Sequence, residues 1–260
     1  MLFPRLTRLL PALLAAALAL PGCKKDADVA TGQVTFTVQN VAGSQPLTLS
    51  GPTYTTAAGE KLTISTFEYY LSNFVFTKAD GTTYAAPNTY FLVDQSRAPS
   101  LTFTIPNVPA GEYTGVSCLI GVDAKTTGLT DPDAFTGALD VLNPANNMYW
   151  GWNTGHIFLK LEGQVTSVSP ARALVCHIGG YADPYSAIVT ATPSLGTKLT
   201  VGTGRTATVA LQADALKCFD GVSRITLSTF ANSMMPGAQA VAVAKNYGAG
   251  MLTITSVQSN

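Results

Sequence analysis

The sequence predicts an all-β protein: an antiparallel β-sandwich or barrel-like domain with one short helix near the C-terminus. Apolar and polar residues alternate in many short segments that are separated by turn residues, as they do in half-buried strands. Charged residues make up only 12% of the chain, whereas residues that favour strands, such as Thr and Val, are abundant. The chain has 260 residues, which is enough for one sizeable core.

The clearest alternation is Val34-Thr35-Phe36-Thr37-Val38, and Ala79-Asp80-Gly81 marks a hairpin after one or two strands at 67–77. Further strands are expected at 90–93, 101–105, 113–120, 156–162, 173–178, 187–191, 206–212, 223–229 and 252–257. The best helix candidate is 239–247, which Gly248 would close. Residues 123–147 lack a regular period, so we expect a long loop, which in a compact domain usually has a purpose.

The N-terminus has the order of a secretory signal. Arg5 and Arg8 precede an apolar run over 9–20, and Pro21-Gly22-Cys23 follows. The apolar run is shorter than the roughly 20 residues that a membrane-spanning helix needs. The ending resembles the lipobox of bacterial lipoproteins, and this resemblance implies a signal peptide over 1–22, a lipid on Cys23 and a tether over 23–32.

A domain over 33–260 would then be held at the membrane by its lipid anchor. The polar start of the tether resembles the sorting pattern of outer-membrane lipoproteins, so we expect the cell envelope, at the outer membrane, facing the periplasm or the cell surface. An ordinary secreted protein with a chance cysteine is the alternative.

The charge content argues against nucleic acid as a partner. Residues 1–22 hold two basic residues and no acidic one, so the remaining chain carries a net charge near −2. It has no basic patch or stripe, and nucleic acid is therefore not an expected partner.

Cys118, Cys176 and Cys218 are an odd set, so at least one is expected to stay free or to pair between chains. An oxidising compartment permits one disulfide, but the spacing does not say which.

Both histidines and both tryptophans of the chain lie close together in the sequence. Met148-Tyr149-Trp150-Gly151-Trp152 leads to His156, and His177 follows on the next expected strand. If these two strands form a hairpin with Leu159 opposite Leu174, His156 stands opposite His177 on the less apolar face, about 5 Å away. Trp150 and Trp152 join that face if the chain stays extended, whereas a register slip of one residue separates the histidines.

Two facing imidazoles suit copper, zinc, iron or nickel. The chain has no third histidine, and no carboxylate lies close by in the sequence, which argues against a zinc site with three or four protein ligands. Cu(I) needs fewer and softer ligands, and a thioether could come from Met148, Met234, Met235 or Met251. The alternative is that each histidine only forms hydrogen bonds on a sheet surface and that the tryptophans pack against it.

Several ordered segments resemble the MbnP-like copper-binding proteins, the relatives of a methanobactin-operon component and of copper-regulated surface proteins. The resemblance covers about residues 33–257, and its most specific parts are Met148-Tyr149-Trp150-Gly151-Trp152, Phe158-Leu159-Lys160-Leu161-Glu162-Gly163 and His177-Ile178-Gly179-Gly180. Further segments that carry it are 67–73, 109–113, 120–123 and 137–140.

The resemblance implies a β-sandwich-like domain and a mononuclear copper site of histidines near a tryptophan. In relatives this tryptophan is oxidised to kynurenine by a diheme c-type partner enzyme, and the product helps to hold copper. Carried over, His177 and His156 are ligand candidates and Trp150 or Trp152 is the candidate for modification. Many relatives carry more histidines near the first and last strands, where this sequence has none.

Two other functions compete with copper handling. An aromatic patch of Tyr149, Trp150, Trp152 and Tyr181, if exposed, would suit a non-catalytic module that binds carbohydrate or protein ligands. Asp123, Asp131 and Asp133 offer oxygens for calcium, although their spacing matches no EF-hand. The sequence lacks the G-x-S-x-G and HExxH motifs of hydrolases, so we expect no enzyme activity.

Overall fold

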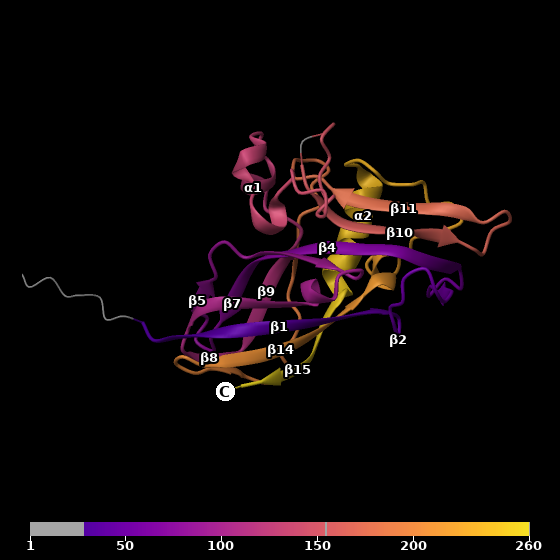
Figure 1. Ribbon diagram of the computed structural model, residues 1–260. Coiled ribbons are helices and arrows are strands. Elements are labelled where there is room, and N and C mark those ends of the chain that lie inside the picture. Colours follow the sequence, from indigo (N-terminus) through magenta and orange to yellow (C-terminus); the bar gives the residue numbers. More distant parts are fainter. Residues whose placement is uncertain (1–28, 154, 260) are drawn as a thin grey trace, which may run out of the picture.

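Two curled β-sheets face each other and enclose the core, with helix α2 (Ala238–Gly250) at one side (Figure 1). The structure is a computed structural model and describes residues 29–153 and 155–259. The predicted signal peptide, Cys23 and most of the predicted tether lie outside the described residues. No helix in the described ranges is long and apolar enough to cross a membrane.

The smaller of the two facing sheets is built around β1, the strand predicted from the alternation at 34–38. β1 pairs with β14 in parallel and with β7 and β2 in antiparallel fashion, and β14 pairs with β15. The strands are β1 (Thr31–Ala42), β2 (Gln45–Pro46), β7 (Thr102–Pro109), β14 (Thr206–Asp214) and β15 (Leu252–Gln258). The predicted all-β sandwich or barrel-like fold is confirmed, and the parallel pair is a departure from its antiparallel order.

The larger sheet is built around β4 (Lys61–Thr77), a single strand where one or two were expected. Asn73 has a φ of 52° and lies at a break in register that lets β4 pair with different partners along its length. The sheet order is β11-β10-β4-β9-β12, and β3, β5 and β6 also pair with β4. These strands are β3 (Tyr54–Thr55), β5 (Thr83–Ala85), β6 (Tyr90–Asp94), β9 (Gly115–Ile120), β10 (Ile157–Val165), β11 (Arg172–Gly179) and β12 (Val189–Ala191).

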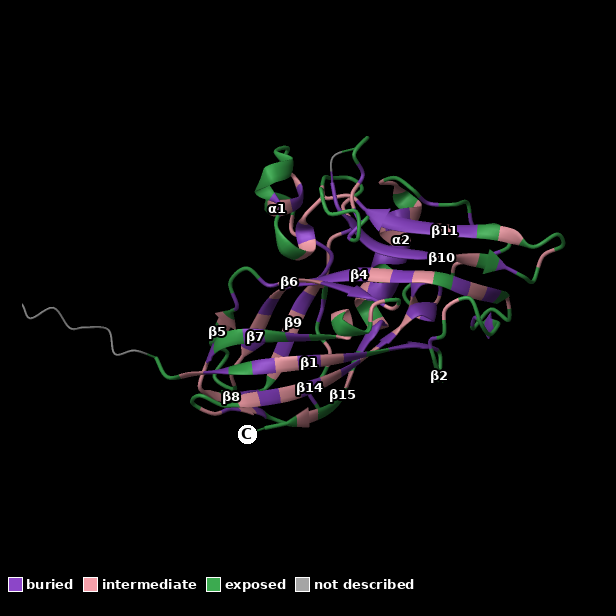
Figure 2. Cartoon of the chain, viewed as in Figure 1, coloured by how far each residue is buried: buried purple, intermediate pink, exposed green. Residues whose placement is uncertain are grey.

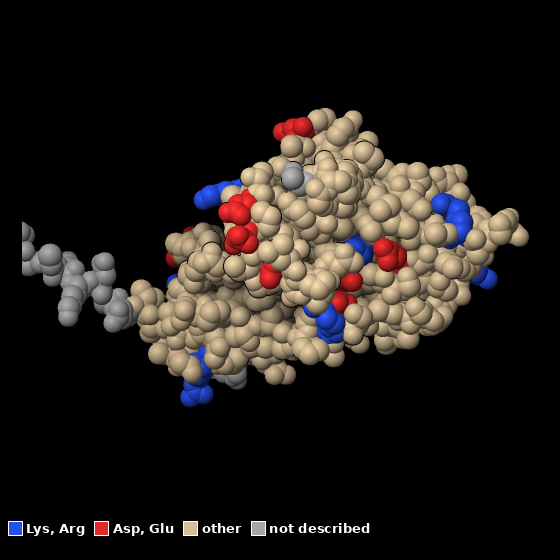
Figure 3. All heavy atoms as spheres, turned by 45° about the horizontal axis from the view of Figure 1, so that its top comes forward, with Lys and Arg blue, Asp and Glu red and all other residues tan. Residues whose placement is uncertain are grey.

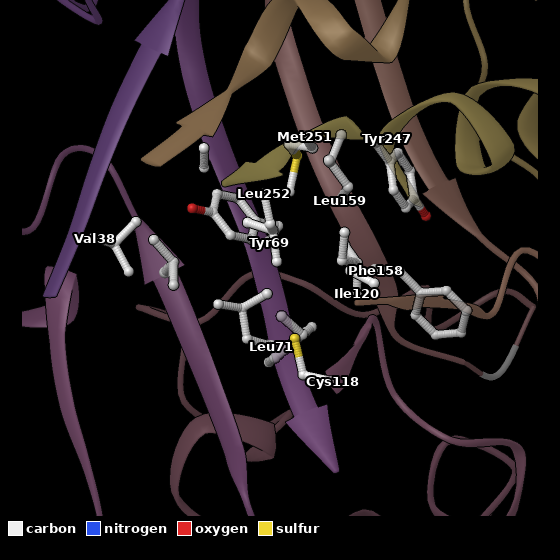
Figure 4. Close-up of a cluster of buried hydrophobic side chains, with 14 of the residues drawn as sticks. Val38, Tyr69, Leu71, Cys118, Ile120, Phe158, Leu159, Tyr247, Met251 and Leu252 are labelled. Atoms are coloured by element: carbon white, nitrogen blue, oxygen red, sulfur yellow. The ribbon is translucent and has the colours of Figure 1, made fainter. Parts of the chain in front are cut away.

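The space between the sheets is filled by side chains from both of them and from α2. Figure 4 shows Val38 of β1, Leu71 of β4 and Leu159 of β10 in this cluster, with Met251 and Leu252 at the junction of α2 and β15. Each large apolar side chain that is fully buried contributes roughly 1.5–3 kcal/mol to stability. In Figure 2 most of β10 and β11 is buried, so the strands that carry the candidate site are part of this core.

The remaining elements are short. β8 (Gly111–Tyr113) and β13 (Leu199–Val201) form a two-stranded sheet. The expected loop at 123–147 is irregular and contains α1 (Ala124–Thr127), η2 (Pro132–Ala134) and η3 (Gly137–Leu139). Two further 3-10 turns are η1 (Ala98–Leu101) and η4 (Ala215–Cys218).

The predicted helix at 239–247 is confirmed, but it does not close at Gly248. A Cβ atom on Gly248 would come within 2.9 Å of the Val189 side chain, so this glycine lets α2 pack closely on β12. The helix continues to Gly250. The glycine is therefore a packing requirement and not a stop signal.

The predicted strand at 223–229 is wrong. The amides of Leu227 and Ser228 donate to the Glu60 carboxylate at 2.5 and 2.7 Å, and Arg172 donates to the carbonyl oxygens of Leu227 and Phe230. Because side chains satisfy these backbone groups, the segment needs no partner strand.

Candidate metal centre

The hairpin of β10 and β11 lies at one edge of the larger sheet, and its predicted register is wrong. Lys160, and not His156, stands opposite His177. The two strands run on to the pair Val165 and Arg172, so the connecting loop is shorter than predicted and centred further along the chain. The predicted core face is correct, since all its members are buried: Ile157, Leu159, Leu161, Leu174, Cys176 and Ile178.

Glu162 fixes the orientation of the His177 ring. Nε2 of His177 lies 2.7 Å from one carboxylate oxygen of Glu162, and the Thr66 hydroxyl donates to the other oxygen at 2.9 Å. Glu162 is two residues beyond Lys160 on β10, so it is a diagonal neighbour of His177 across the ladder. A carboxylate distant in sequence thus joins the histidine in space.

The pKa shifts of His177 and Glu162 favour a neutral imidazole beside an ionised carboxylate. Burial lowers the pKa of His177 below its usual value, and the hydrogen bond with Glu162 offsets only part of that effect. Burial raises the pKa of Glu162, but hydrogen bonds from His177 and Thr66 outweigh it and leave this pKa below its usual value. Nε2–H of His177 then donates to Glu162, and Nδ1 keeps its lone pair. Among the described residues, Nδ1 has no hydrogen-bond partner.

Charged side chains continue from His177 across the sheet. Lys160 of β10 stands between His177 and Glu68 of β4, and Glu68 stands opposite Asp94 of β6. Lys160 is only 4% exposed; its Nζ lies 3.6 Å from Glu68 and donates to the carbonyl oxygen of Asn147. Figure 3 shows several charged side chains gathered near the middle of a face that is otherwise mostly uncharged.

A second, shorter hairpin pairs residues 148–150 with 155–157, and Trp152 follows closely after its first strand. The amide of Trp150 donates to the carbonyl of Gly155 at 2.9 Å, and the amide of Asn153 donates back to Trp150 at 3.1 Å. The ring centroids of Trp150 and Trp152 are 5.6 Å apart. Trp152 is 61% exposed and Trp150 only 4%, so the expected exposed patch does not include Trp150.

The Trp150 ring packs on the face of β11 that carries His177. A Cβ atom on Gly179 would come within 2.9 Å of the six-membered ring of Trp150, and residues 177 and 179 of a strand point to the same face. The indole Nε1 is buried and has no hydrogen-bond partner among the described residues. Leaving such a group unpaired costs about 1–3 kcal/mol, and it calls for a specific explanation.

His156 has protein partners at both ring nitrogens. Nδ1 is 3.2 Å from the Thr127 hydroxyl, and Nε2 is 3.1 Å from the Leu139 carbonyl oxygen. Because that carbonyl can only accept, Nε2 carries the proton and Nδ1 accepts from Thr127. Three aromatic rings meet the imidazole edge to face: Tyr70, Phe135 and Tyr149. His156 therefore anchors the 123–147 loop on the sheet.

Met148 lines a cavity of about 340 Å³ together with His156 and Tyr70. Its side chain is 1% exposed. Nothing in the described contacts brings Met148 to His177. Within residues 29–153 and 155–259, no three His, Cys, Asp or Glu side chains form a group that would hold a metal ion.

The other candidate ligands have structural roles. Asp123 and Asp131 accept amide hydrogen bonds at the starts of α1 and η2. Among the described residues the three acidic residues of the calcium hypothesis do not gather into a site. Cys118, Cys176 and Cys218 are buried free thiols.

Glu162 and Lys160 are the members of the centre that the sequence reasoning missed. The alternation places both residues on the His177 face, and this signal becomes usable once the hairpin register is known. Pairwise register depends on the loop length, and the loop at 166–171 contains no turn signal strong enough to fix it.

Fold and site together define a β-sandwich-type protein in which a carboxylate-bound histidine lies beside a buried tryptophan. The sequence matches the MbnP family over residues 31–236, and the chain belongs to this family. Its membership confirms the resemblance found in the sequence and supports a copper-related role.

Among solved structures, MbnP from Methylosinus trichosporium is similar, with a TM-score of 0.53 and 15% sequence identity. The match covers 88% of this chain and 99% of that chain. At this identity the likeness speaks for the fold alone. No curated protein matches the sequence.

Proposed function

We propose that this chain binds a copper ion, as Cu(I), at His177 beside Trp150. The observation that carries the proposal is the hydrogen bond between His177 and Glu162. Histidines that bind metals almost always donate their other ring N–H to a carboxylate, a carbonyl or water, which fixes the tautomer and makes the free nitrogen a better donor. Here Nε2 is engaged and Nδ1 is left for the metal.

Trp150 fits the second half of such a site. Its buried N–H has no hydrogen-bond partner among the described residues. Indole is a poor metal ligand, whereas kynurenine would supply an aromatic amine and a carbonyl. We therefore assign Trp150, rather than Trp152, as the residue that a diheme c-type partner would oxidise, and this chain as the substrate of that enzyme and not a catalyst.

His156, Met148, Glu162 and Lys160 would not bind the metal directly. His156 would have to give up Thr127 or Leu139 before it could bind a metal, and Met148 lines the cavity beside it. Glu162 and Lys160 hold the ligand face in place from β10. The function is then capture or handling of copper by a lipoprotein of the cell envelope, anchored through Cys23 at the outer membrane.

The first experiment compares copper content per chain in wild type, His177→Ala, Glu162→Gln and His156→Gln, with intact mass on protein from the native source. We expect His177→Ala to lose the copper ion bound at this site and Glu162→Gln to bind it about 10- to 100-fold more weakly, the usual effect of removing a residue that holds a metal-binding histidine. His156→Gln keeps copper. A mass increase on the Trp150 peptide would support conversion to kynurenine.

Absence of copper from wild type under both reducing and oxidising conditions, with an unmodified mass, would refute the proposal. The exposed Trp152 would then favour a module that binds carbohydrate or protein ligands through aromatic side chains.

A further inference from the structure

Two neighbouring methionines, Met234 and Met235, are exposed directly beside the proposed site. Their exposed fractions are 48% and 61%, whereas the other methionines in the described ranges, Met148 and Met251, are each 1% exposed. Figure 4 shows Met251 inside the core. An adjacent pair of exposed large apolar side chains is uncommon enough to ask what it binds.

The backbone of this segment is fixed against the edge strand of the larger sheet. The amide of His177 donates to the carbonyl of Ser233 at 2.7 Å, and the amide of Ser233 donates to the carbonyl of Val175 at 2.9 Å. Ser233 thus pairs with Cys176 in parallel fashion. The Asn232 side chain accepts from the same strand at 3.1 Å.

Residues 233–236 also contact the chain just after β11, at Gly180. A Cβ atom on Gly180 would come within 3.0 Å of the Pro236 ring, so Pro236 packs on Gly180. Since Ser233 lies beside Cys176 and Pro236 beside Gly180, the two methionines between them run alongside residues 177–179. These residues include His177 and also Gly179, on which the Trp150 ring packs.

The same end of the molecule exposes aromatic rings. Trp152 is 61% and Tyr185 is 45% exposed. A cavity of about 270 Å³ is lined by Trp150, Tyr185 and Pro236 among others, so the tryptophan hairpin and the residue that follows the two methionines border one hollow. The buried indole of the proposed site forms part of its wall.

The exposed side chains of this surface suit soft monovalent cations. Thioethers select Cu(I) over hard ions, and they bind without losing a proton. An indole face attracts cations as well. The backbone pairing of Ser233 therefore brings a segment with two exposed thioethers next to β11, the strand that carries His177.

We propose that Met234 and Met235 form an outer acceptor site for Cu(I), which passes the ion to His177. The transfer rests on the proposed function, but binding at the methionines does not. No electron is moved in the transfer: Cu(I) exchanges thioether ligands for an imidazole nitrogen and keeps its oxidation state.

The test uses Ag(I), a monovalent ion of the same softness that does not change oxidation state, followed by native mass spectrometry and tryptophan fluorescence. The key variant is Met234→Leu with Met235→Leu, which removes both sulfur atoms and keeps the size and apolar character of the side chains. Met251→Leu makes the same chemical change in the core and serves as the matched control. His177→Ala removes the inner ligand.

We expect about two Ag(I) ions per chain in wild type and in Met251→Leu, and about one in the double methionine variant and in His177→Ala. Cu(I) supplied as a chelate should reach His177 more slowly in the double methionine variant, with the same final occupancy of the His177 site. An Ag(I) count and a loading rate equal to those of Met251→Leu would overturn the outer site.

Two mixed results separate the claims. If the count falls but the loading rate does not change, the transfer is refuted and the binding site stands. If His177→Ala binds as much Ag(I) as wild type while the methionine variant binds none, the outer site stands and the proposed His177 centre fails.

Discussion

At the scale of single residues, the two histidines differ in how their ring nitrogens are used. Both nitrogens of His156 have partners in the protein, whereas His177 has Glu162 at one nitrogen and no described partner at the other. Sequence reasoning found both residues because histidine is rare in this chain. It could not separate their roles, since these depend on the hairpin register and on contacts with the distant Thr127 and Leu139.

Protonation of His156 should weaken the fold. Burial lowers the pKa of His156 below its ordinary value of 6.5, and the Leu139 carbonyl offsets only part of this shift. Because the unfolded chain binds the proton more readily, the contribution to stability is complete above about pH 6.5 and is lost as the pH falls below that value. His156→Gln can keep the bond to Leu139 but does not titrate.

We therefore expect the free energy of unfolding to fall less between about pH 7.5 and 5.5 in His156→Gln than in wild type. Urea unfolding at the two pH values measures the difference. His177 contributes in the same direction because its pKa is also lowered by burial, so some pH dependence remains in the variant. Equal changes in both proteins would contradict the assignment.

At the scale of elements, Lys160 ties the tryptophan hairpin to β10. Its ammonium group donates to the carbonyl of Asn147, the residue just before the hairpin, and lies beside Glu68. Burial raises the pKa of Glu68, and the charge of Lys160 works against that rise. Without Lys160, both a carbonyl oxygen and a carboxylate lose their partner in a mostly buried place.

Lys160→Met should destabilise the domain by roughly 1–3 kcal/mol, the cost of leaving buried polar groups unpaired. Adding Glu68→Gln to this variant should recover part of the loss, because the unpaired charge is gone. Denaturant unfolding of the two single variants and the double variant gives the coupling energy. Additive losses would mean that the two side chains do not interact.

The strands with clear alternation are found close to their predicted positions, including β1, β4, β14 and β15. The alternation of apolar and polar residues shows which face of a strand is buried, and it can be read from each segment alone. The non-strand at 223–229 depends on the distant side chains of Glu60 and Arg172, and the parallel pairing of β1 joins it to β14, a strand far away in the sequence. The sequence pattern of one segment contains no information about such distant contacts.

At the scale of the whole molecule, the predicted lipid anchor would set how far the domain lies from the membrane. β1 begins at Thr31, eight residues after Cys23. A fully extended chain of that length spans at most roughly 28 Å. If Cys23 is lipidated, the domain is held close to the membrane surface and meets partners there rather than far from it.

The anchor makes a direct prediction. Cys23→Ser in the full-length chain, expressed in a bacterial host, should move the protein from the membrane fraction to the soluble envelope fraction. Wild type should also gain the mass of a lipid at its mature N-terminus. Recovery of both proteins in the soluble fraction, with no added mass, would favour the ordinary secreted protein.

The place of Glu162 also depends on the next residue, Gly163. A Cβ atom there would come within 1.8 Å of the Thr63 carbonyl oxygen, and the β10–β4 register shifts between Glu162 and Gly163. This shift sets Thr66 opposite Glu162. Even the smallest side chain at 163 would push the two strands apart and take the carboxylate away from the Thr66 hydroxyl. The alignment of His177 with Glu162 thus depends on the absence of a side chain at position 163.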